Sequence, residues 1–330
     1  MLRVAVLGAG RIGRIHAANA ALNRNTKLVA VADPFGDGAK TLAAEWGCEA
    51  TTDPLATLQR ADIDAVVIGT PTDTHVALTL EAVRAGKAVL CEKPIDLDIS
   101  KVDAAVAEVE RLNGRVMVAF NRRFDPSAQA MRKSMDAGEI GELRQVIISS
   151  RDPGPPPRDY VKHSGGIFRD MTIHDFDMAR WLLGEEPVEI SASASRLIDP
   201  SLEEFEDFDT VMVNLRTASG RQCHINCCRA TSYGYDQRME VFGADGMLLN
   251  ENLRASTLRR WSGAYTEARE PLLNFFLERY EAAYRTEFEH FRAAVEGNKA
   301  MPVTMHDGRQ ALRLADAALE SALSGRVVTV

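Results

Sequence analysis

Asp170, His174 and Asp177 lie four and three residues apart in a stretch that opens with two glycines and continues as a helical pattern to Leu183. In one helix, positions i, i+4 and i+7 share a face, so the imidazole would lie between two carboxylates. A carboxylate one turn from an imidazole can orient the ring and stabilise its protonated form, and such a pair can take a proton from a hydroxyl near neutral pH. The spacing also fits a partly solvated helix face whose histidine caps or packs.

A glycine motif follows the first apolar run of the chain, residues 2–7. Gly8 permits a tight turn, Gly10 allows a pyrophosphate to approach the backbone, and Gly13 lets the following helix pack against the strand. The first turn of that helix would offer N–H groups and the positive end of its dipole to the phosphates. The contact residues expected for this dinucleotide-binding loop are Gly8, Gly10, Arg11, Ile12 and Gly13.

The second strand pattern, residues 27–32, ends at Asp33, about twenty residues after Gly13. A carboxylate at this point binds the adenosine ribose hydroxyls and repels a 2′-phosphate. No arginine follows directly, since the next residues are Pro34 and Phe35. We therefore predict NAD rather than NADP as the cofactor; the alternative is a strand, turn and helix that bind no nucleotide.

Strand and helix patterns alternate up to about residue 120, which predicts a doubly wound parallel sheet of the Rossmann type with helices on both faces. Ligands of such sheets bind outside the carboxyl ends of the strands, where several polar segments of this chain would gather. The further cofactor contacts expected at this edge are Thr70, Pro71, His75, Glu92, Lys93 and Arg122.

Lys93 stands directly before Pro94 at the end of one strand pattern, so its backbone conformation is restricted. A cation there could bond a substrate hydroxyl and stabilise alkoxide character as that hydroxyl is oxidised. The residue types leave this role and that of a surface lysine in a turn equally open.

The sequence changes character after about residue 124. A proline-rich loop at 153–157 precedes the stretch that contains Asp170, and short strand patterns with tight turns then follow. They predict a C-terminal α/β domain with an open, mostly antiparallel sheet, closed by two helical patterns. The length of 330 residues also favours two domains, which we place at 1–122 for the cofactor and at 123–330 for the substrate and oligomerisation.

Charge and composition exclude several classes of partner. The net charge is −8 and no run of lysine or arginine is present, so nucleic acid and anionic membrane surfaces are poor partners. No apolar stretch approaches the length of a membrane span. The first strand pattern begins at once, with no signal peptide before it, and we therefore expect a cytoplasmic protein.

The five cysteines do not predict a disulfide framework, because their number is odd and no export signal is present. Cys223, His224, Cys227 and Cys228 could suggest a zinc site. They lie in one strand pattern, where alternation places the first and third on one face and the other two on the opposite face. Ligands on opposite faces cannot converge on one ion, so we predict no metal site.

Together these motifs resemble those of the Gfo/Idh/MocA oxidoreductase family, and they look most like its bacterial inositol 2-dehydrogenase branch. The glycine motif and the Glu-Lys-Pro sequence at 92–94 mark the wide family. The stretch 165–183 and the Arg-Asp-Pro-Gly sequence at 151–154 are more specific to the inositol branch. The resemblance covers most of the chain and includes the segments 121–126 and 233–238.

The resemblance implies NAD-dependent oxidation of a ring hydroxyl of a cyclic polyol, most simply of myo-inositol to 2-keto-myo-inositol, by a homotetramer or homodimer. It implies that Lys93, Asp170 and His174 are the catalytic residues. Some relatives carry a histidine near Ser150 and an asparagine in place of Asp152, so the favoured polyol is left open. The residues implied to hold substrate hydroxyls are Lys93, Arg123, Asp152, Asp170, His174, Asp177, Tyr235 and Tyr280, of which the two tyrosines lie outside closely matching motifs.

Four other functions are compatible with these residues. A pyranose offers a similar ring of hydroxyls, so an aldose 1-dehydrogenase fits as well, as does a preference for scyllo-inositol. A lyase or glycosidase that recycles its cofactor would turn over without net NADH formation. A non-catalytic NAD(H)-binding sensor is the alternative from another class, although a sensor has no need of a base opposite the nicotinamide.

Overall fold

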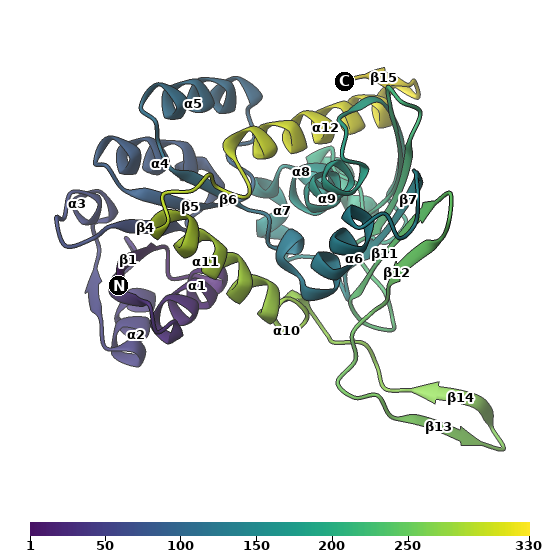
Figure 1. The fold of residues 1–330 in the computed structure, drawn as a ribbon, viewed down its shortest axis with the longest axis horizontal. Helices are drawn as coiled ribbons and strands as arrows, with labels where there is room; N and C mark the ends of the chain where they lie inside the picture. Colours follow the sequence, from purple (N-terminus) through teal and green to yellow (C-terminus); the bar gives the residue numbers. More distant parts are fainter. The chain divides into compact units, whose positions relative to one another are not determined.

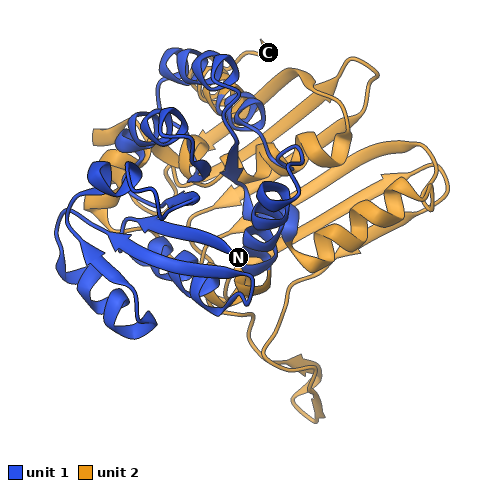
Figure 2. Ribbon diagram, turned by 60° about the vertical axis from the view of Figure 1, so that its left-hand side comes forward, with its two compact units in different colours: residues 1–124, 283–312 blue, residues 125–282, 313–330 orange.

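The computed structural model describes residues 1–330 and divides into two compact units. Unit 1 contains residues 1–124 and 283–312, and unit 2 contains residues 125–282 and 313–330 (Figure 2). The chain therefore leaves unit 1 after residue 124, returns to it at residue 283 and leaves it again after residue 312 to end in unit 2. None of the helices has both the length and the apolar character needed to cross a membrane.

Unit 1 is built on a six-stranded sheet in which every pair of neighbouring strands is parallel. The strand order β3-β2-β1-β4-β5-β6 reverses between β1 and β4, which confirms the predicted doubly wound sheet. Both β4 and β5 are buried along their whole length, as expected for strands covered on both faces. The strands are β1 (Leu2–Leu7), β2 (Thr26–Ala32), β3 (Glu49–Thr51), β4 (Ala65–Ile68), β5 (Ala88–Glu92) and β6 (Val116–Ala119).

Helices connect these strands and lie against the sheet. Residues 37–58 form two helices and a short strand that the sequence analysis did not identify. The connecting helices are α1 (Arg11–Leu22), α2 (Asp37–Trp46), α3 (Pro54–Leu58), α4 (His75–Arg84) and α5 (Ile99–Arg111), with 3₁₀ turns η1 (Thr72–Thr74) and η2 (Asn121–Phe124).

The segment that returns to unit 1 contains most of α11 (Glu281–Glu296) and the first part of α12 (Met305–Ser324). The ring of Tyr284 in α11 meets the ring of His16 in α1 edge-on, with 5.9 Å between their centroids. Helix α11 therefore packs within unit 1.

The division predicted at 1–122 and 123–330 does not contain this return, so it is corrected here. The physical reason is that helical periodicity shows that a helix has a buried side, but not which core that side contacts. In α11 the buried side includes Tyr284 and Phe288, and it packs in unit 1.

Unit 2 is built on a seven-stranded sheet of order β12-β11-β7-β10-β9-β8-β15. The pair β7 and β10 is parallel and the other neighbours are antiparallel, which confirms the predicted mostly antiparallel sheet. The strands are β7 (Leu143–Arg151), β8 (Pro187–Ser195), β9 (Thr210–Thr217), β10 (Gln222–Cys228), β11 (Asp236–Gly243), β12 (Met247–Asn250) and β15 (Val328–Thr329).

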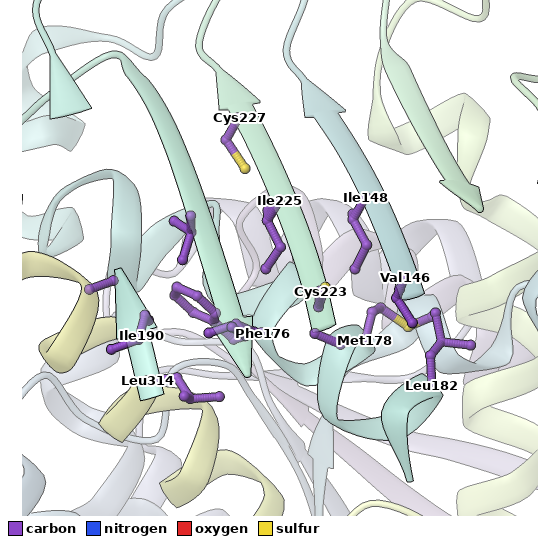
Figure 3. Close-up of a cluster of buried hydrophobic side chains, with 14 of the residues drawn as sticks. Val146, Ile148, Phe176, Met178, Leu182, Ile190, Cys223, Ile225, Cys227 and Leu314 are labelled. Carbon is purple, nitrogen blue, oxygen red and sulfur yellow. The ribbon is translucent and has the colours of Figure 1, made fainter. Parts of the chain in front are cut away.

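One face of this sheet carries the core of unit 2 (Figure 3). Buried and more exposed residues alternate along β9 and β10, so each strand sends every second side chain into the core. The opposite face of the sheet is left open. The core side chains labelled in Figure 3 are Val146, Ile148, Ile190, Cys223, Ile225 and Cys227 from the strands, and Phe176, Met178, Leu182 and Leu314 from helices α9 (Ile173–Leu183) and α12.

This alternation also places the cysteines. Cys223 and Cys227 are buried on the core face, whereas His224 and Cys228 lie on the other face, and all five cysteines of the chain are free thiols. No group of three or more His, Cys, Asp or Glu side chains is arranged to hold a metal ion.

A hairpin of β13 (Arg259–Ser262) and β14 (Tyr265–Arg269) projects away from the seven-stranded sheet of unit 2 (Figure 1). The sequence analysis did not identify it, because its strands are short and carry charges on both faces. The remaining helices of unit 2 are α6 (Pro126–Asp136), α7 (Arg158–Ser164), α8 (Gly166–Asp170), η3 (Pro200–Phe205) and α10 (Phe276–Arg279).

Candidate functional site

The glycine loop between β1 and α1 forms a cradle that only small residues can line. A Cβ on Gly13 would lie 2.0 Å from the carbonyl oxygen of Gly8, and a Cβ on Gly8 would lie 2.5 Å from that of Gly69. Around Gly10, by contrast, no atom lies within 4 Å of the corresponding point. Helix α1 begins after Gly10 with no side-chain cap and no acidic residue in its first turn. The loop and the helix N-terminus therefore fit a dinucleotide pyrophosphate.

Asp33 lies beside this loop at the end of β2. Its Oδ2 accepts a hydrogen bond from the backbone N–H of Ala9 at 2.7 Å, and its Oδ1 accepts one from Phe35 at 2.9 Å. These two bonds fix the carboxylate at the carboxyl edge of the sheet, next to the loop. This is the position from which a carboxylate binds ribose hydroxyls, so the residues present fit NAD.

His75 joins the ends of two strands rather than presenting its ring to a ligand. The side chain is 1% exposed, and its two ring nitrogens lie 2.8 Å from the carbonyl oxygen of Pro94 and 2.9 Å from that of Thr70. The hydroxyl of Thr70 in turn bonds that of Thr74 at 2.6 Å. Both ring nitrogens of His75 thus have protein partners, and the direct cofactor contact predicted from the sequence stays a prediction.

Glu92 is the last residue of β5, Lys93 directly follows it, and the Lys93–Pro94 peptide bond is cis. Glu92 is buried, and its Oε1 lies 2.8 Å from Nε2 of His16 in α1. Its Oε2 accepts a hydrogen bond from the backbone N–H of Lys93 at 3.3 Å. The predicted catalytic lysine is therefore tied through Glu92 to the helix that begins at the glycine loop.

The sequence analysis missed His16, although a signal was present. Gly13, His16, Ala17 and Ala20 occupy one buried face of α1, and histidine is the one polar side chain on it. A polar side chain on the buried face of a helix needs a partner. The partner, Glu92, lies 76 residues further along the chain, and no local pattern identifies it.

Arg122 and Arg123 follow β6 in the turn η2, and both are 7% exposed. Nη2 of Arg123 lies 2.9 Å from Oδ1 of Asp307. Burial alone would raise the pKa of Asp307, but the charge of Arg123 and the N–H of Thr304 lower it to about 2. Arg123, predicted to bind substrate, thus has an ionised carboxylate as partner within unit 1.

In unit 2, the stretch predicted as a single helix forms two helices, α8 and α9. The backbone N–H of Thr172 donates to the carbonyl oxygen of Ile167, five residues earlier, so the junction contains one residue more than an α-helical turn. Asp170 ends α8, whereas His174 and Asp177 belong to α9. Asp170 therefore does not lie on the same continuous helix as His174 and Asp177, contrary to what the i, i+4, i+7 spacing predicts.

Asp170 is anchored at both carboxylate oxygens. Oδ1 accepts a hydrogen bond from the hydroxyl of Tyr160 at 2.7 Å, and Oδ2 accepts one from Nη1 of Arg229 at 3.2 Å. His174 lies in the first turn of α9 and is partly exposed, whereas Asp177 is fully buried with Nη1 of Arg180 3.9 Å away. The sequence analysis identified neither Tyr160 nor Arg229.

Two other predicted substrate residues come together from distant parts of unit 2. The rings of Tyr235 and Tyr280 are perpendicular, with 6.0 Å between their centroids, and both side chains are 5% exposed. The hydroxyl of Tyr280 donates to Oε1 of Gln237 at 3.4 Å, and so does the hydroxyl of Ser150 at 3.1 Å. Asp152 follows β7 just after Ser150, so four of the five residues belong to or directly flank β7 and β11.

The cradle predicts different outcomes for two similar substitutions. Gly13→Ala should destabilise the protein by about 1–3 kcal/mol, because its Cβ would overlap the Gly8 carbonyl oxygen. Gly10→Ala should leave the melting temperature unchanged and weaken NADH binding at least about tenfold, because its Cβ would occupy the space left for the pyrophosphate. Thermal unfolding and NADH fluorescence titration measure the two effects. A Gly10→Ala variant that binds NADH as tightly as the wild type would show that the pyrophosphate does not lie against Gly10.

Comparisons with known proteins agree with this geometry. Residues 2–120 match the model of the oxidoreductase family with an NAD-binding Rossmann fold, and residues 128–249 match that of the GFO/IDH/MocA C-terminal domain. Inositol 2-dehydrogenase of Rhizobium meliloti is 51% identical over 330 residues, which cover 100% of this chain and 99% of that protein.

Two solved structures are similar over the whole chain. A myo-inositol dehydrogenase from Corynebacterium glutamicum has a TM-score of 0.97 at 48% identity, with 100% of this chain and 99% of that chain covered. Scyllo-inositol dehydrogenase from Lactobacillus casei, with bound cofactor NAD(H) and scyllo-inositol, has a TM-score of 0.93 at 29% identity, with 100% of this chain and 99% of that chain covered. With its glycine cradle, its two units and these full-length similarities, the chain belongs to the Gfo/Idh/MocA family of oxidoreductases.

Proposed function

We propose that the protein is an NAD-dependent dehydrogenase that oxidises a ring hydroxyl of a cyclic polyol, with myo-inositol to 2-keto-myo-inositol as the favoured reaction. One observation carries the proposal: a unit with a dinucleotide cradle is joined to a unit in which a partly exposed histidine follows a carboxylate anchored by two partners. The similarity to inositol dehydrogenases over the full length supports the choice of substrate.

The proposed chemistry gives each catalytic residue one task. His174 takes the proton of the substrate hydroxyl, and Asp170 supports the charge that the imidazole gains. Lys93 bonds the same oxygen and stabilises its developing negative charge. NAD, when bound, supplies the acceptor for the hydride that leaves the ring carbon. The products are the ketone, NADH and one proton.

The remaining predicted residues would bind and orient the other hydroxyls of the ring. The buried carboxylate of Asp177 and the carboxylate of Asp152 can accept hydrogen bonds from hydroxyls, and the hydroxyls of Tyr235 and Tyr280 can both donate and accept them. Arg123, held by Asp307, can only donate. In unit 1, Gly8, Gly10 and Gly13 with Asp33 are proposed to hold the cofactor, with Arg11, Ile12, Thr70, Pro71 and Arg122 beside them.

A preference for scyllo-inositol is the second candidate, because a similar solved structure is that of a scyllo-inositol dehydrogenase. An aldose 1-dehydrogenase and a cofactor-recycling lyase or glycosidase keep the same fold and cofactor. The sensor function is disfavoured, since Lys93, Asp170 and His174 occur together in one chain and a sensor needs none of them.

The first experiment measures NADH formation from NAD with myo-inositol, scyllo-inositol and D-glucose in parallel, and repeats each assay with NADP. We expect turnover of an inositol with NAD and much slower turnover with NADP, because Asp33 repels a 2′-phosphate. The order of the rates identifies the favoured polyol. If all three polyols fail while NADH still binds, the proposed reaction is refuted in favour of another polyol, a cofactor-recycling reaction or a sensor.

His174 can be tested separately from cofactor binding. His174→Ala should lower kcat by about 10²–10⁴-fold, the usual contribution of a general base, and leave the Kd for NADH within about twofold. Steady-state kinetics and fluorescence titration give the two quantities. Oxidation of the polyol at the wild-type rate would show that His174 is not the base.

We also propose that the open face of the unit 2 sheet pairs with the same face of a second copy, giving a homodimer or a homotetramer. Soluble monomers rarely leave a broad apolar face in water, and a self-complementary face is typical of homo-oligomers. The exposed apolar side chains of this open face are Ile147, Met212, Phe242, Met247 and Leu249.

The five free thiols suit a reducing compartment, so we place the reaction in the cytoplasm, in the catabolism of inositol.

Charged substitutions on the open face should therefore lower the oligomeric state. The double variant Ile147→Asp with Met212→Asp should sediment as a smaller species than the wild type, because carboxylates would be buried without partners in the interface. Leu22→Asp is the matched control, since Leu22 is 73% exposed in unit 1, away from this sheet. Sedimentation velocity gives the mass of each, and an unchanged mass for the double variant would contradict the proposed interface.

A further inference from the structure

Arg229 is a buried cation among three carboxylates of unit 2. It directly follows β10 and is 1% exposed. Its Nη1 lies 3.2 Å from Oδ2 of Asp170, and its Nη2 lies 3.6 Å from Oδ2 of Asp207. Asp152 follows the neighbouring parallel strand β7, and its backbone N–H donates to the carbonyl oxygen of Cys228 at 2.9 Å. Burial alone would lower the pKa of Arg229, but attraction to Asp170, Asp207 and Asp152 raises it.

Asp207 fixes the start of the short helix that Asp170 ends. Oδ1 of Asp207 accepts a hydrogen bond from the backbone N–H of Ile167 at 2.7 Å, in the first turn of α8. The approach is close, because a Cβ on Gly166 would lie 2.8 Å from the same oxygen. Since Arg229 pairs with both Asp207 and Asp170, one guanidinium links the residues at the two ends of α8.

The two partners of Asp170 differ in kind. The hydroxyl of Tyr160 is neutral and its side chain is 50% exposed, so this partner contributes direction but no charge. Arg229 is permanently charged and buried, and it therefore stabilises the ionised form of the carboxylate. Without Arg229, the carboxylates of Asp170, Asp207 and Asp152 would lose the buried cation that attracts all three.

We infer that Arg229 is a positioning residue, which keeps the carboxylate of Asp170 ionised and oriented for its action with His174. The inference rests on the proposed function, because it assigns Arg229 a part in that reaction. It also goes beyond that function, since Arg229 is expected to touch neither the polyol nor the cofactor and to act through Asp170. Arg229 and Tyr160 contact Asp170 directly, Asp207 and Asp152 act on Arg229 from the other side, and His174 is the proposed partner of Asp170 in the reaction.

The experiment compares Arg229→Gln, which removes the charge, with Arg229→Lys, which keeps the charge but not the two-pronged shape of the guanidinium. For Arg229→Gln we expect kcat to fall about tenfold or more, and the acid limb of the kcat–pH profile to move to higher pH, because a carboxylate without its cation is protonated more easily. Arg229→Lys should restore the position of the acid limb and recover kcat only in part. The Kd for NADH should stay within about twofold in both variants.

Arg221→Gln is the matched control. Arg221 directly precedes β10, and its Nη1 donates to the carbonyl oxygen of Leu183 at 2.6 Å, far along the strand from Asp170. Its loss should lower the melting temperature and leave kcat and the pH profile unchanged. This control separates the loss of a structural bond in unit 2 from the loss of positioning at Asp170.

Each outcome decides the inference. Arg229→Gln with the wild-type kcat and pH profile overturns it, as does a loss of activity that matches the unfolded fraction alone. If Arg229→Gln does not fold, Arg229→Lys decides: an unchanged kcat refutes the inference, and a reduced kcat with an unmoved acid limb supports it. A wild-type protein that oxidises no polyol refutes the proposed function and this inference together. Polyol oxidation that is insensitive to Arg229 refutes the inference alone.

Discussion

The contact between Gly13 and the carbonyl oxygen of Gly8 determines how closely α1 lies on the sheet of unit 1, and the other features of that unit's edge follow from it. Because the helix lies this close, His16 one turn later reaches Glu92 at the end of β5. Glu92 in turn bonds the backbone N–H of Lys93. The glycine cradle and the turn of the proposed catalytic lysine are therefore parts of one packed assembly, in which a shift of α1 would disturb both.

Unit 2 relies on paired charges where unit 1 relies on close backbone packing. Besides the pair of Arg229 and Asp207, Asp236 forms a second centre at the ends of β7 and β11. Burial would raise the pKa of Asp236, but hydrogen bonds from Arg238 and other donors lower it to about 2. One of these donors is Arg151, the residue before Asp152, so the centre fixes the strand end from which Asp152 emerges. The donors to Asp236 are Arg151, Tyr233, Arg238 and Asn252.

The sequence was sufficient for several local properties. The apolar run at 2–7 has the predicted bounds, the strand predicted at 27–32 begins one residue earlier, and the alternation that separates Cys223 from His224 follows from strand geometry alone. The sequence was insufficient where interacting residues lie far apart along the chain. The pairing of His16 with Glu92, the return of α11 to unit 1 and the position of Arg229 beside Asp170 depend on which core or strand end each segment meets. The junction between α8 and α9 at Thr172 was missed for another reason: the residue pattern is helical on both sides of it, so one extra residue leaves no mark in the sequence.

The charges around Arg229 also bear on the class of substrate. Asp152, Asp170 and Asp207 all attract the guanidinium of Arg229, so carboxylates are concentrated around this buried cation. An anionic substrate such as a sugar phosphate or an acid would be repelled there, whereas the hydroxyls of a neutral polyol can donate hydrogen bonds to the carboxylates. An asparagine in place of Asp152 would remove one of these charges while keeping an acceptor oxygen. The carboxylate at this position therefore strengthens the selection for hydroxyl donors, and it makes the balancing cation of Arg229 more necessary.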